Sequence, residues 1–521
     1  MTTDTATEPY PVDAARPARG LIPLFLGLTL SMLLAALSQT VLATALPTMV
    51  GELDGVAQMP WVITAYFLAA TVVLPIYGKV GDLIGRKRLL LAAILLFMAG
   101  SLIGALAGDM SWLIAGRAVQ GLGGGGLIIL SQAIIADVVP ARERGRYMGV
   151  MGGVFAFASV AGPLLGGWFT EGPGWRWTFW INLPLGAVAL LVAVVFLHLP
   201  NGSYHGRDRR PRLDYLGMGL LIVATTCLVL VGTWGGSTYS WGSVTVLSLI
   251  AVTVVAGALF VGVERRASEP IVPLRLFRNR DFNLTTAAGL LTGVAMFGAI
   301  AYLPTYLQMT TGADATVAGL LMIPMMAALL LTSVVVGWYV SRTGRYRLLP
   351  IVGSVTIAGA LLLMSTVAVS TPVWLTCLYI SVFGAGLGSS LQLLVLVVQN
   401  SFPIRAVGTA SAANNFFRQV GGSLGTAVVG AVFASRLLRL LAERLPDRDA
   451  LPDGADSLTP AVVRSLPVPV RQSVLDSYNE ALTPVFLLMV PLGVVAAILL
   501  CFLTGKPLAT RIDRDPPGPP G

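Results

Sequence analysis

The charged residues best placed for chemistry lie in residues 78–88, where Gly-Lys-Val-Gly-Asp-Leu-Ile-Gly-Arg-Lys-Arg follows an apolar stretch. Gly78 and Gly85 permit close approach of a neighbouring helix. Asp82 can dock on the N-terminus of that helix or pair with Arg86, and such a contact can form in one arrangement of helices and break in another. We therefore interpret Asp82 as a conformational latch. The alternative is a tight basic loop that only fixes topology.

Three more charged residues lie inside apolar stretches or at their ends. We expect Asp137 to reach the membrane face of Asp82 and Arg86 and to form a charge relay with them, the alternative being a helix-end cap. An arginine within a membrane span is costly unless it faces protein or water. Arg117 and Arg418 are therefore expected to be either functional or static, and for Arg418 we favour the structural role.

The remaining candidates for a central substrate cavity are uncharged. No Asp or Glu lies near the middle of a predicted span, so a neutral, zwitterionic or lipid-like substrate fits better than a dication. The alternative for each candidate is ordinary hydrogen bonding or packing between helices. With Arg418, the candidates are Ser38, Gln39, Gln120, Gln132, Phe297, Tyr302, Gln392 and Asn414.

These residues must be positioned by membrane-spanning helices. The chain has 521 residues, 55% apolar and 11% charged, and apolar stretches of about 20 residues recur along it. Because a backbone in hydrocarbon can satisfy its polar groups only as a helix or a closed barrel, we predict an all-α integral membrane protein. The predicted spans are 21–47, 59–80, 88–107, 110–137, 146–170, 178–199, 214–234, 243–263, 282–307, 315–340, 347–368, 372–399, 408–434 and 481–504.

The placement of basic residues predicts the orientation. With a cytoplasmic N-terminus, 25 of the 34 Lys and Arg residues fall on the inside, and Arg176 is the only one in a short outside loop. Both termini are then cytoplasmic and the loop 435–480 faces outward. The first residues lack the pattern of a removable signal peptide, so the first span is expected to remain.

Two internal echoes predict a duplicated bundle. Residues 78–88 recur in degenerate form at 337–347, where the arginines remain and the acid is lost, and Gly121 and Gly123 are echoed by Gly384 and Gly386. The echoes lie eight spans apart, which two six-helix bundles with two inserted spans explain. The expected parts are a cytoplasmic tail (1–20), the first bundle (21–200), a basic linker with the inserted spans (201–281), the second bundle (282–505) and a cytoplasmic tail (506–521).

The fifth span carries glycines that permit close helix packing and a proline that bends its axis. We interpret this group as a structural pivot, together with Gly78 and Gly85. Its members are Gly149, Gly162, Pro163, Gly166 and Gly167.

These motifs, in this order, resemble the major facilitator superfamily, and specifically its fourteen-span drug:proton antiporters of the QacA/EmrB type. The resemblance rests on residues 78–88, on 113–123 in the fourth span, on the fifth-span glycines, and on 175–186, 303–308 and 414–422. It implies export of small molecules by alternating access. It also implies that Arg117 bonds the first span and senses the protonation of a neighbour.

One departure from that family bears on coupling. Such relatives usually carry Asp near the end of the first span, where this chain has Ser38. Coupling would then run through an interfacial carboxylate, Asp82 or Asp137 first, or be weak or absent. His198 and His205 near the end of the sixth span are the only histidines.

We therefore expect a multidrug exporter driven by proton antiport in a bacterial cell membrane. Its partners would be a lipophilic or amphiphilic substrate, protons and membrane lipids, with a monomer as the default. The alternatives are an exporter of lipids, natural products or siderophores, an uncoupled facilitator, and more remotely a sensor or a membrane enzyme. Scattered cysteines and clustered basic residues predict no metal, no cofactor and no nucleic acid.

Overall fold

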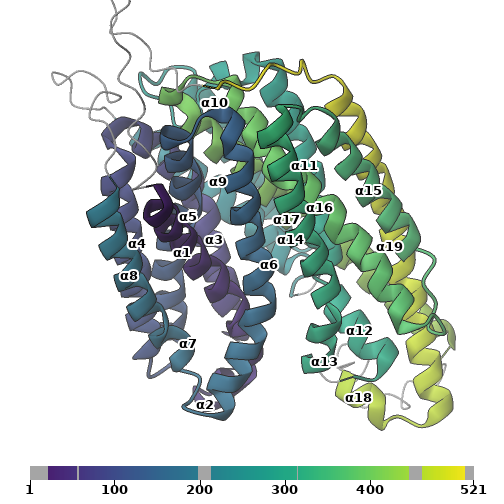
Figure 1. Ribbon diagram of the computed structural model, residues 1–521. Coiled ribbons are helices and arrows are strands. Elements are labelled where there is room, and N and C mark those ends of the chain that lie inside the picture. Colours follow the sequence, from purple (N-terminus) through teal and green to yellow (C-terminus); the bar gives the residue numbers. More distant parts are fainter. Residues whose placement is uncertain are drawn as a thin grey trace, which may run out of the picture.

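The computed structural model describes residues 21–55, 58–197, 213–236, 238–313, 315–444 and 460–510, and these residues are almost entirely helical (Figure 1). Thirteen helical segments are long and apolar enough to cross a membrane, and a further apolar helix of 17 residues lies where the eleventh span is predicted. The prediction of an all-α membrane protein with fourteen spans is confirmed. His198 and His205 lie outside the described residues.

The first bundle contains the predicted spans 1 to 6 and forms one side of the molecule (Figure 1). Its helices are α1 (Leu21–Thr40), α2 (Leu42–Glu52), α3 (Met59–Ile84), α4 (Arg86–Ala105), α5 (Met110–Val138), α6 (Ala141–Glu171), α7 (Trp177–Trp180) and α8 (Asn182–Phe196).

The inserted pair consists of α9 (Tyr215–Trp234) and α10 (Val244–Glu264), which pack on each other. A short 3-10 helix, η2 (Leu274–Arg278), leads into the second bundle. That bundle contains α11 (Arg280–Ile300), α12 (Leu303–Thr311), α13 (Ala315–Leu321), α14 (Ile323–Thr343), α15 (Leu348–Met364), α16 (Val373–Ser401), α17 (Ile404–Arg444), α18 (Pro460–Ser465) and α19 (Val468–Cys501).

Local sequence signals set several helix ends. Asp109, Asp214, Ser243 and Asn279 each accept a hydrogen bond from the backbone N–H three residues later, which satisfies a donor that a helix start leaves free. Gly85 separates α3 from α4 with φ 105°, a region that side chains with a Cβ rarely adopt.

The predicted outward loop 435–480 needs correction, because much of it is helical. The helix α17 continues to Arg444, and α19 begins at Val468. These extensions carry charged residues, which is why hydropathy did not find them. They are held together by an ion pair of 2.6 Å between Arg444 and Glu480 and by burial of Leu441 and Val474.

Several predicted single spans are two helices in sequence. The first span breaks at Val41, the sixth at Ile181 and the ninth between Ile300 and Leu303. The two bundles meet along two seams, where α3 packs on α17 and α6 packs on α14. The inserted helix α9 also packs on both α3 and α17.

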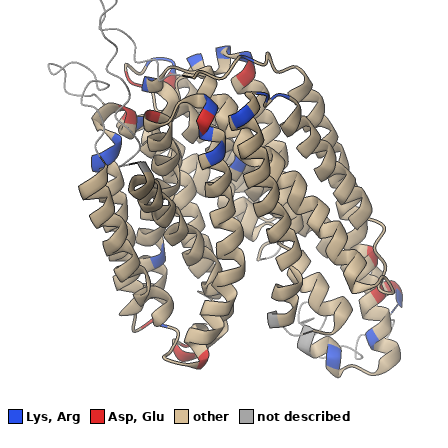
Figure 2. Ribbon diagram, viewed as in Figure 1, with Lys and Arg blue, Asp and Glu red and all other residues tan. Residues whose placement is uncertain are grey.

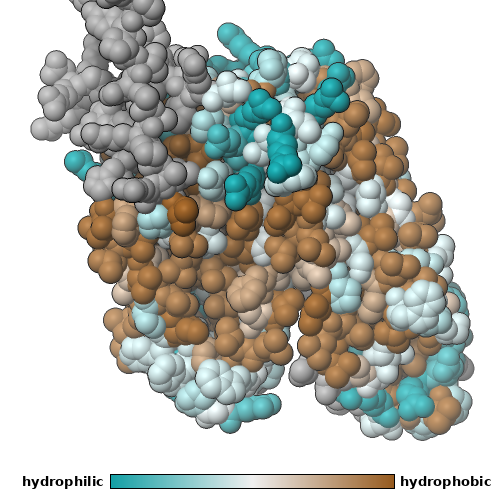
Figure 3. All heavy atoms as spheres, in the orientation of Figure 1, coloured by the Kyte–Doolittle hydropathy of each residue, from teal (hydrophilic) through white to brown (hydrophobic). Residues whose placement is uncertain are grey.

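The two ends of the molecule differ in charge. Lys79, Arg86, Arg142 and Arg342 lie at the end that we call the basic end, where Lys and Arg gather along the upper edge in Figure 2. Apolar side chains cover most of the height below it in Figure 3, as a bilayer requires. At the opposite end, a notch separates the two halves of the molecule (Figure 3).

Candidate functional site

Arg86 joins two carboxylates of the first bundle at the basic end. It is the first residue of α4 and is 3% exposed. One terminal nitrogen lies 2.6 Å from Asp82 Oδ1 and the other lies 2.6 Å from Asp137 Oδ1. The turn at Gly85 reverses the chain between α3 and α4, so that Asp82 and Arg86 pair across it. Asp137 comes from the last turn of α5.

This cluster also reaches the second bundle. Asp82 Oδ2 accepts hydrogen bonds from the backbone N–H of Thr409 at 2.7 Å and from its hydroxyl at 2.8 Å. Arg86 donates to the carbonyl of Ile404 at 3.0 Å. A Cβ added to Gly408 would lie 2.3 Å from Asp82 Oδ1, so a larger residue there would displace this carboxylate. One carboxylate therefore links α3 to the beginning of α17 in this arrangement.

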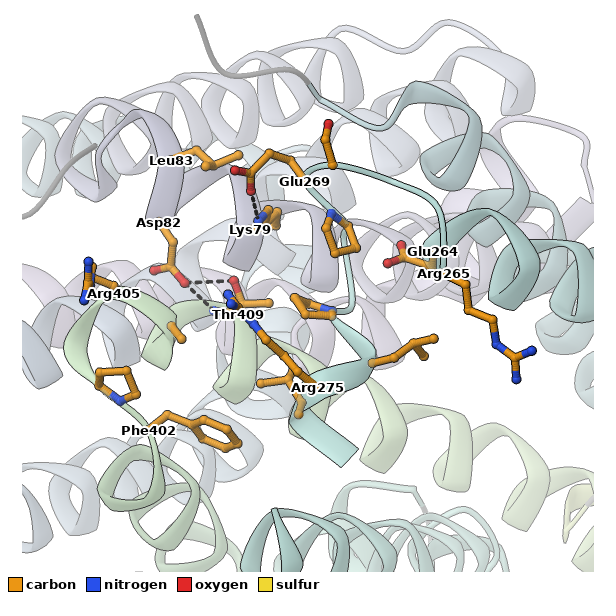
Figure 4. Close-up of a pocket in the computed structure, with 17 residues that line it drawn as sticks. Lys79, Asp82, Leu83, Glu264, Arg265, Glu269, Arg275, Phe402, Arg405 and Thr409 are labelled. Carbon is orange, nitrogen blue, oxygen red and sulfur yellow. Dashed lines mark hydrogen bonds and ion pairs between the residues drawn. The ribbon is translucent and has the colours of Figure 1, made fainter. Parts of the chain in front are cut away.

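A pocket of about 800 Å³ lies beside this contact (Figure 4). Its walls are α3, the segment between α10 and η2, and the beginning of α17. Lys79 pairs with Glu269 across it at 2.6 Å. The segment after the inserted pair therefore contacts the same end of α3 that carries Asp82.

Glu264 is a buried carboxylate in this pocket that sequence reasoning missed, because it lies just past the predicted eighth span. It is 3% exposed. Its Oε1 accepts from the backbone N–H groups of Ile271 and Val272, which holds the linker against α10. Its Oε2 has no hydrogen-bond partner among the described residues. A search for Asp and Glu residues near the centres of the predicted spans does not include Glu264.

The seam between α6 and α14 closes at the basic end through backbone contact. A Cβ at Gly337 would lie 2.2 Å from the carbonyl oxygen of Gly145, and one at Gly149 would lie 2.5 Å from that of Ser333. Arg142 donates to the carbonyl of Arg342 at 2.8 Å. The structure thus places Arg142 across this seam.

The other expected pivot residues fall into two groups. Gly162 and Gly166 pack against Thr40 and Thr44 within the first bundle, near Pro163. Gly78 lies at the seam against Gly408 and Ala412. The expectation that Gly167 permits close helix packing needs correction, since a Cβ there would meet nothing within 4 Å. It follows Gly166 by one residue, about 100° around the helix, and so faces away from α2.

Arg117 is fully engaged inside the first bundle. Its guanidinium donates to the carbonyl of Val62 at 3.1 Å, to the hydroxyl of Ser38 at 3.0 Å and to Gln120 Oε1 at 2.5 Å. It also lies 4.2 Å from the centre of the Tyr66 ring. Arg117 therefore contacts the first span, and its partners are neutral.

This arrangement changes the account of three cavity candidates. Ser38 and Gln120 are 2% and 0% exposed and bind Arg117 in the bundle interior, so neither faces a cavity here. Gln120 also donates to Ser101 at 2.8 Å. Gln39, one residue from Ser38, is exposed.

The centre between the bundles contains other predicted candidates. Gln132 of α5 accepts from Asn415 of α17 at 3.1 Å, and its carbonyl accepts from Gln399 of α16 at 3.3 Å. Phe297 of α11 packs edge to face on Phe67 of α3, with 6.2 Å between ring centres.

The last candidates lie on the second bundle. Gln392 of α16 approaches Gly152 of α6, so it lies at the seam. Asn414 is 2% exposed and donates to Thr286 within its own bundle, so it does not face a cavity in this arrangement. Tyr302 is half-buried against Phe433.

The described residues contain no group of three His, Cys, Asp or Glu side chains that could hold a metal ion. Several polar groups of this site form hydrogen bonds between the two bundles, and a change in the arrangement of the bundles would break these bonds. A family model, Major Facilitator Superfamily, matches residues 28–426.

The chain belongs to the Major Facilitator Superfamily. The resemblance found in the sequence is thereby confirmed, and the chain is a multi-pass membrane transporter and not an enzyme.

Bacterial superfamily members are similar over most of their length. An MFS-type transporter of Mycobacterium tuberculosis is 42% identical over 490 residues, 94% of this chain and 70% of its own. Multidrug transporter protein MdtP of Bacillus subtilis is 35% identical over 83% of this chain and 79% of its own. Multidrug resistance protein 3 of the same organism is 32% identical over 92% and 94%.

Two solved superfamily structures show the same fold. The proton:xylose symporter XylE aligns with a TM-score of 0.59 and 15% identity over 94% of this chain and 97% of its own. The human organic anion transporter MFSD10 aligns with a TM-score of 0.58 and 16% identity over 92% and 100%.

Proposed function

We propose that this superfamily member exports lipophilic or amphiphilic small molecules by proton antiport and alternating access. Relatives named as multidrug transporters and efflux pumps, at 31 to 35% identity, support export. The observation that carries the mechanism is the pair of hydrogen bonds that Thr409 donates to Asp82, which joins the bundles at one end while a notch separates them at the other (Figure 3).

The basic end faces the cytoplasm in this proposal, because basic loops are retained on that side. The arrangement described here is then open to the outside and closed inside. We place the protein in a bacterial cell membrane with both termini cytoplasmic, as a monomer. The two rocking units are residues 21–200 and 282–505, and 201–281 carries the inserted pair.

Protons act on the carboxylates that share Arg86. Protonation of Asp82 or Asp137 removes one of the two negative charges that hold the guanidinium. A protonated Asp82 is also a weaker acceptor for Thr409, because hydrogen bonds to charged groups are stronger than neutral ones. Proton binding therefore favours release of the contact and opening of the basic end.

An uncoupled facilitator is the second candidate. It is favoured by the neutral pair of Arg117 and Ser38, since no carboxylate lies where related antiporters usually carry Asp. The same pair supports transport of neutral or lipid-like molecules.

Efflux of a fluorescent lipophilic dye from proteoliposomes under an imposed pH gradient tests the proposal. Wild type is compared with Asp82→Asn, Asp137→Asn and Ser38→Asp. We expect gradient-driven efflux in wild type and a loss of about tenfold or more in either Asn variant, because a charge-assisted contact is removed. Gradient-independent movement in wild type that becomes proton-driven only in Ser38→Asp would establish the facilitator instead.

A further inference from the structure

Two arginines lie within membrane-spanning helices, and their surroundings differ. Arg117 is 2% exposed and has four neutral acceptors besides the ring of Tyr66. Arg418 is half-buried, and its only hydrogen bond among the described residues is donated by Nη2 to Asn415 Oδ1 at 2.6 Å. No acidic residue of the described chain forms an ion pair with Arg418. Its charge is therefore uncompensated by the protein.

Arg418 faces the space between the bundles. It lies on α17 between Asn415 and Gly422, which are three residues before and four residues after it and so share its face. Asn415 bonds Gln132 of the first bundle. A Cβ on Gly422 would lie 2.4 Å from the ring of Phe297, which packs on Phe67 of the first bundle. The helix face that carries Arg418 therefore meets the first bundle at Asn415 and approaches an aromatic contact between the bundles one turn further on, at Gly422.

A guanidinium carries five N–H donors arranged to bind a planar or tetrahedral anion through two hydrogen bonds. The single amide oxygen of Asn415 leaves most of these donors available. An uncompensated charge at this depth is costly, so such residues usually serve a function. The rings of Phe67 and Phe297 offer an apolar surface about one helical turn along the same face of α17.

We propose that Arg418 binds the anionic group of an amphiphilic substrate, a carboxylate, sulfonate or phosphate, while the apolar part of the substrate packs against Phe67 and Phe297. This assignment rests on the proposed export function and names its substrate class. The structural role that the sequence favoured for Arg418 does not account for its single neutral partner.

Three dyes with one fluorophore and different charges test this assignment: dansylglycine is anionic, dansylamide is neutral and dansylcadaverine is cationic. Their binding is titrated by fluorescence to the full-length protein in phosphatidylcholine nanodiscs. The variants are Arg418→Gln, Arg418→Lys and, as a control on the same helix, Arg439→Gln, whose side chain is 63% exposed and far from the centre. Thermal unfolding of each variant verifies folding.

We expect wild type and Arg439→Gln to bind dansylglycine about tenfold more tightly than dansylamide, because a charge-assisted hydrogen bond is gained. Arg418→Gln should lose this preference and keep its dansylamide affinity, and Arg418→Lys should keep part of the preference. Equal binding of all three dyes by wild type, or an unchanged preference in Arg418→Gln, would overturn the assignment.

Two further measurements distinguish a lipid ligand from a substrate, and binding from export. Loss of the Arg418-dependent binding in nanodiscs that contain phosphatidylglycerol, after correction by Arg439→Gln, would assign the arginine to a lipid phosphate and overturn the substrate proposal. Uptake of the dyes into inside-out vesicles tests export separately. Charge-selective binding without uptake would count against export alone, whereas uptake without charge preference would count against the role of Arg418 alone.

Discussion

At the scale of single residues, the contact between Asp82 and Thr409 has the strength needed to set the balance between two arrangements. A hydrogen bond to a charged group contributes about 1.5–3 kcal/mol, and about 1.4 kcal/mol changes an equilibrium tenfold. Thr409 donates two such bonds, one from its backbone and one from its hydroxyl. Removing the hydroxyl alone should therefore shift the population without abolishing closure.

We predict that Thr409→Val increases the share of molecules open at the basic end by about tenfold, and that Asp82→Asn increases it further. Spin labels at Arg88 and Arg345, two exposed positions on opposite bundles, report this as longer electron-electron distances. Thr310→Val, whose hydroxyl bonds only the carbonyl of Tyr306 within α12, is the matched control. Identical distance distributions for Thr409→Val and wild type would exclude a role for this hydroxyl in closure.

The sequence could name the charged residues but not their partners. The acid, the glycines and the basic residues of 78–88 follow from composition and spacing, whereas the donor Thr409 lies more than 300 residues away and only the packing of α3 on α17 reveals it. Likewise, Gln120 has the chemistry of a cavity residue, but its direction around α5 places it in the bundle interior. Glu264 was missed because the end of α10 extends beyond the apolar stretch.

At the scale of helices, hydropathy predicts where spans occur because length and apolar character are linear properties of the chain. It does not predict breaks such as Val41, which depend on packing of α1 and α2 on α6. The repeated motif does predict a shared turn: Gly85 and Gly344 end α3 and α14 with φ values of 105° and 72°. The sequence does not show why Gly337 and Gly78 must be small, because the residues that approach them belong to a helix of the other bundle.

We predict that Gly337→Leu reduces transport by more than tenfold while Gly167→Leu leaves it close to wild type. A side chain at Gly337 would collide with the backbone of Gly145, and overpacking typically costs about 1–3 kcal/mol, whereas Gly167 faces open space. Dye efflux normalised to the amount of reconstituted protein measures the effect. Equal losses in both variants would mean that the leucine acts through general helix disruption.

Glu52, at the end of α2, binds Trp175 and Arg176 in the segment before α7. A hydrogen bond from Arg176, with another from Trp175, lowers the pKa of Glu52. A lowered pKa in the folded state gives stability that is present above about pH 4.3, the unfolded value, and lost as pH falls through the folded value. Glu52→Gln should therefore lower the stability slightly at pH 7, by at most about 1 kcal/mol, and this deficit should disappear once the pH falls below the folded pKa of Glu52.

Thermal unfolding of the purified protein at pH 7 and at an acid pH below the folded pKa of Glu52 measures this difference. Asp54→Asn, a neighbouring acid for which the structure shows no ion pair, is the control. A deficit in Glu52→Gln that persists at acid pH would show that the side chain acts through its shape and not through its charge.

At the scale of the whole molecule, the seams explain how one end can close while the other is open. At the basic end the bundles touch through backbone at Gly145 and Gly337 and through the bonds of Asp82 and Arg142. At the other end Figure 3 shows the notch. The duplicated bundles could be predicted from the repeat, but the arrangement in which they are described could not, because each arrangement uses the same sequence.

We predict that the basic end lies in the cytoplasm. A membrane-impermeant maleimide should label Gly172→Cys in intact cells and Arg88→Cys only in inside-out vesicles, both in a background without the three native cysteines. Gly172 follows α6 at the opposite end from Arg88. Labelling of Arg88→Cys in intact cells would reverse the orientation, and with it the direction of transport that we propose.

The inserted pair lies over only one of the two seams between the bundles. Because α9 packs on both α3 and α17, it covers that seam, whereas the seam between α6 and α14 has no inserted pair on it. A molecule dissolved in the bilayer that enters between the bundles from the side would then have one route in place of two. We expect such a molecule to pass along α6 and α14, so that bulky residues introduced on the lipid side of that seam would slow the most lipid-soluble substrates first.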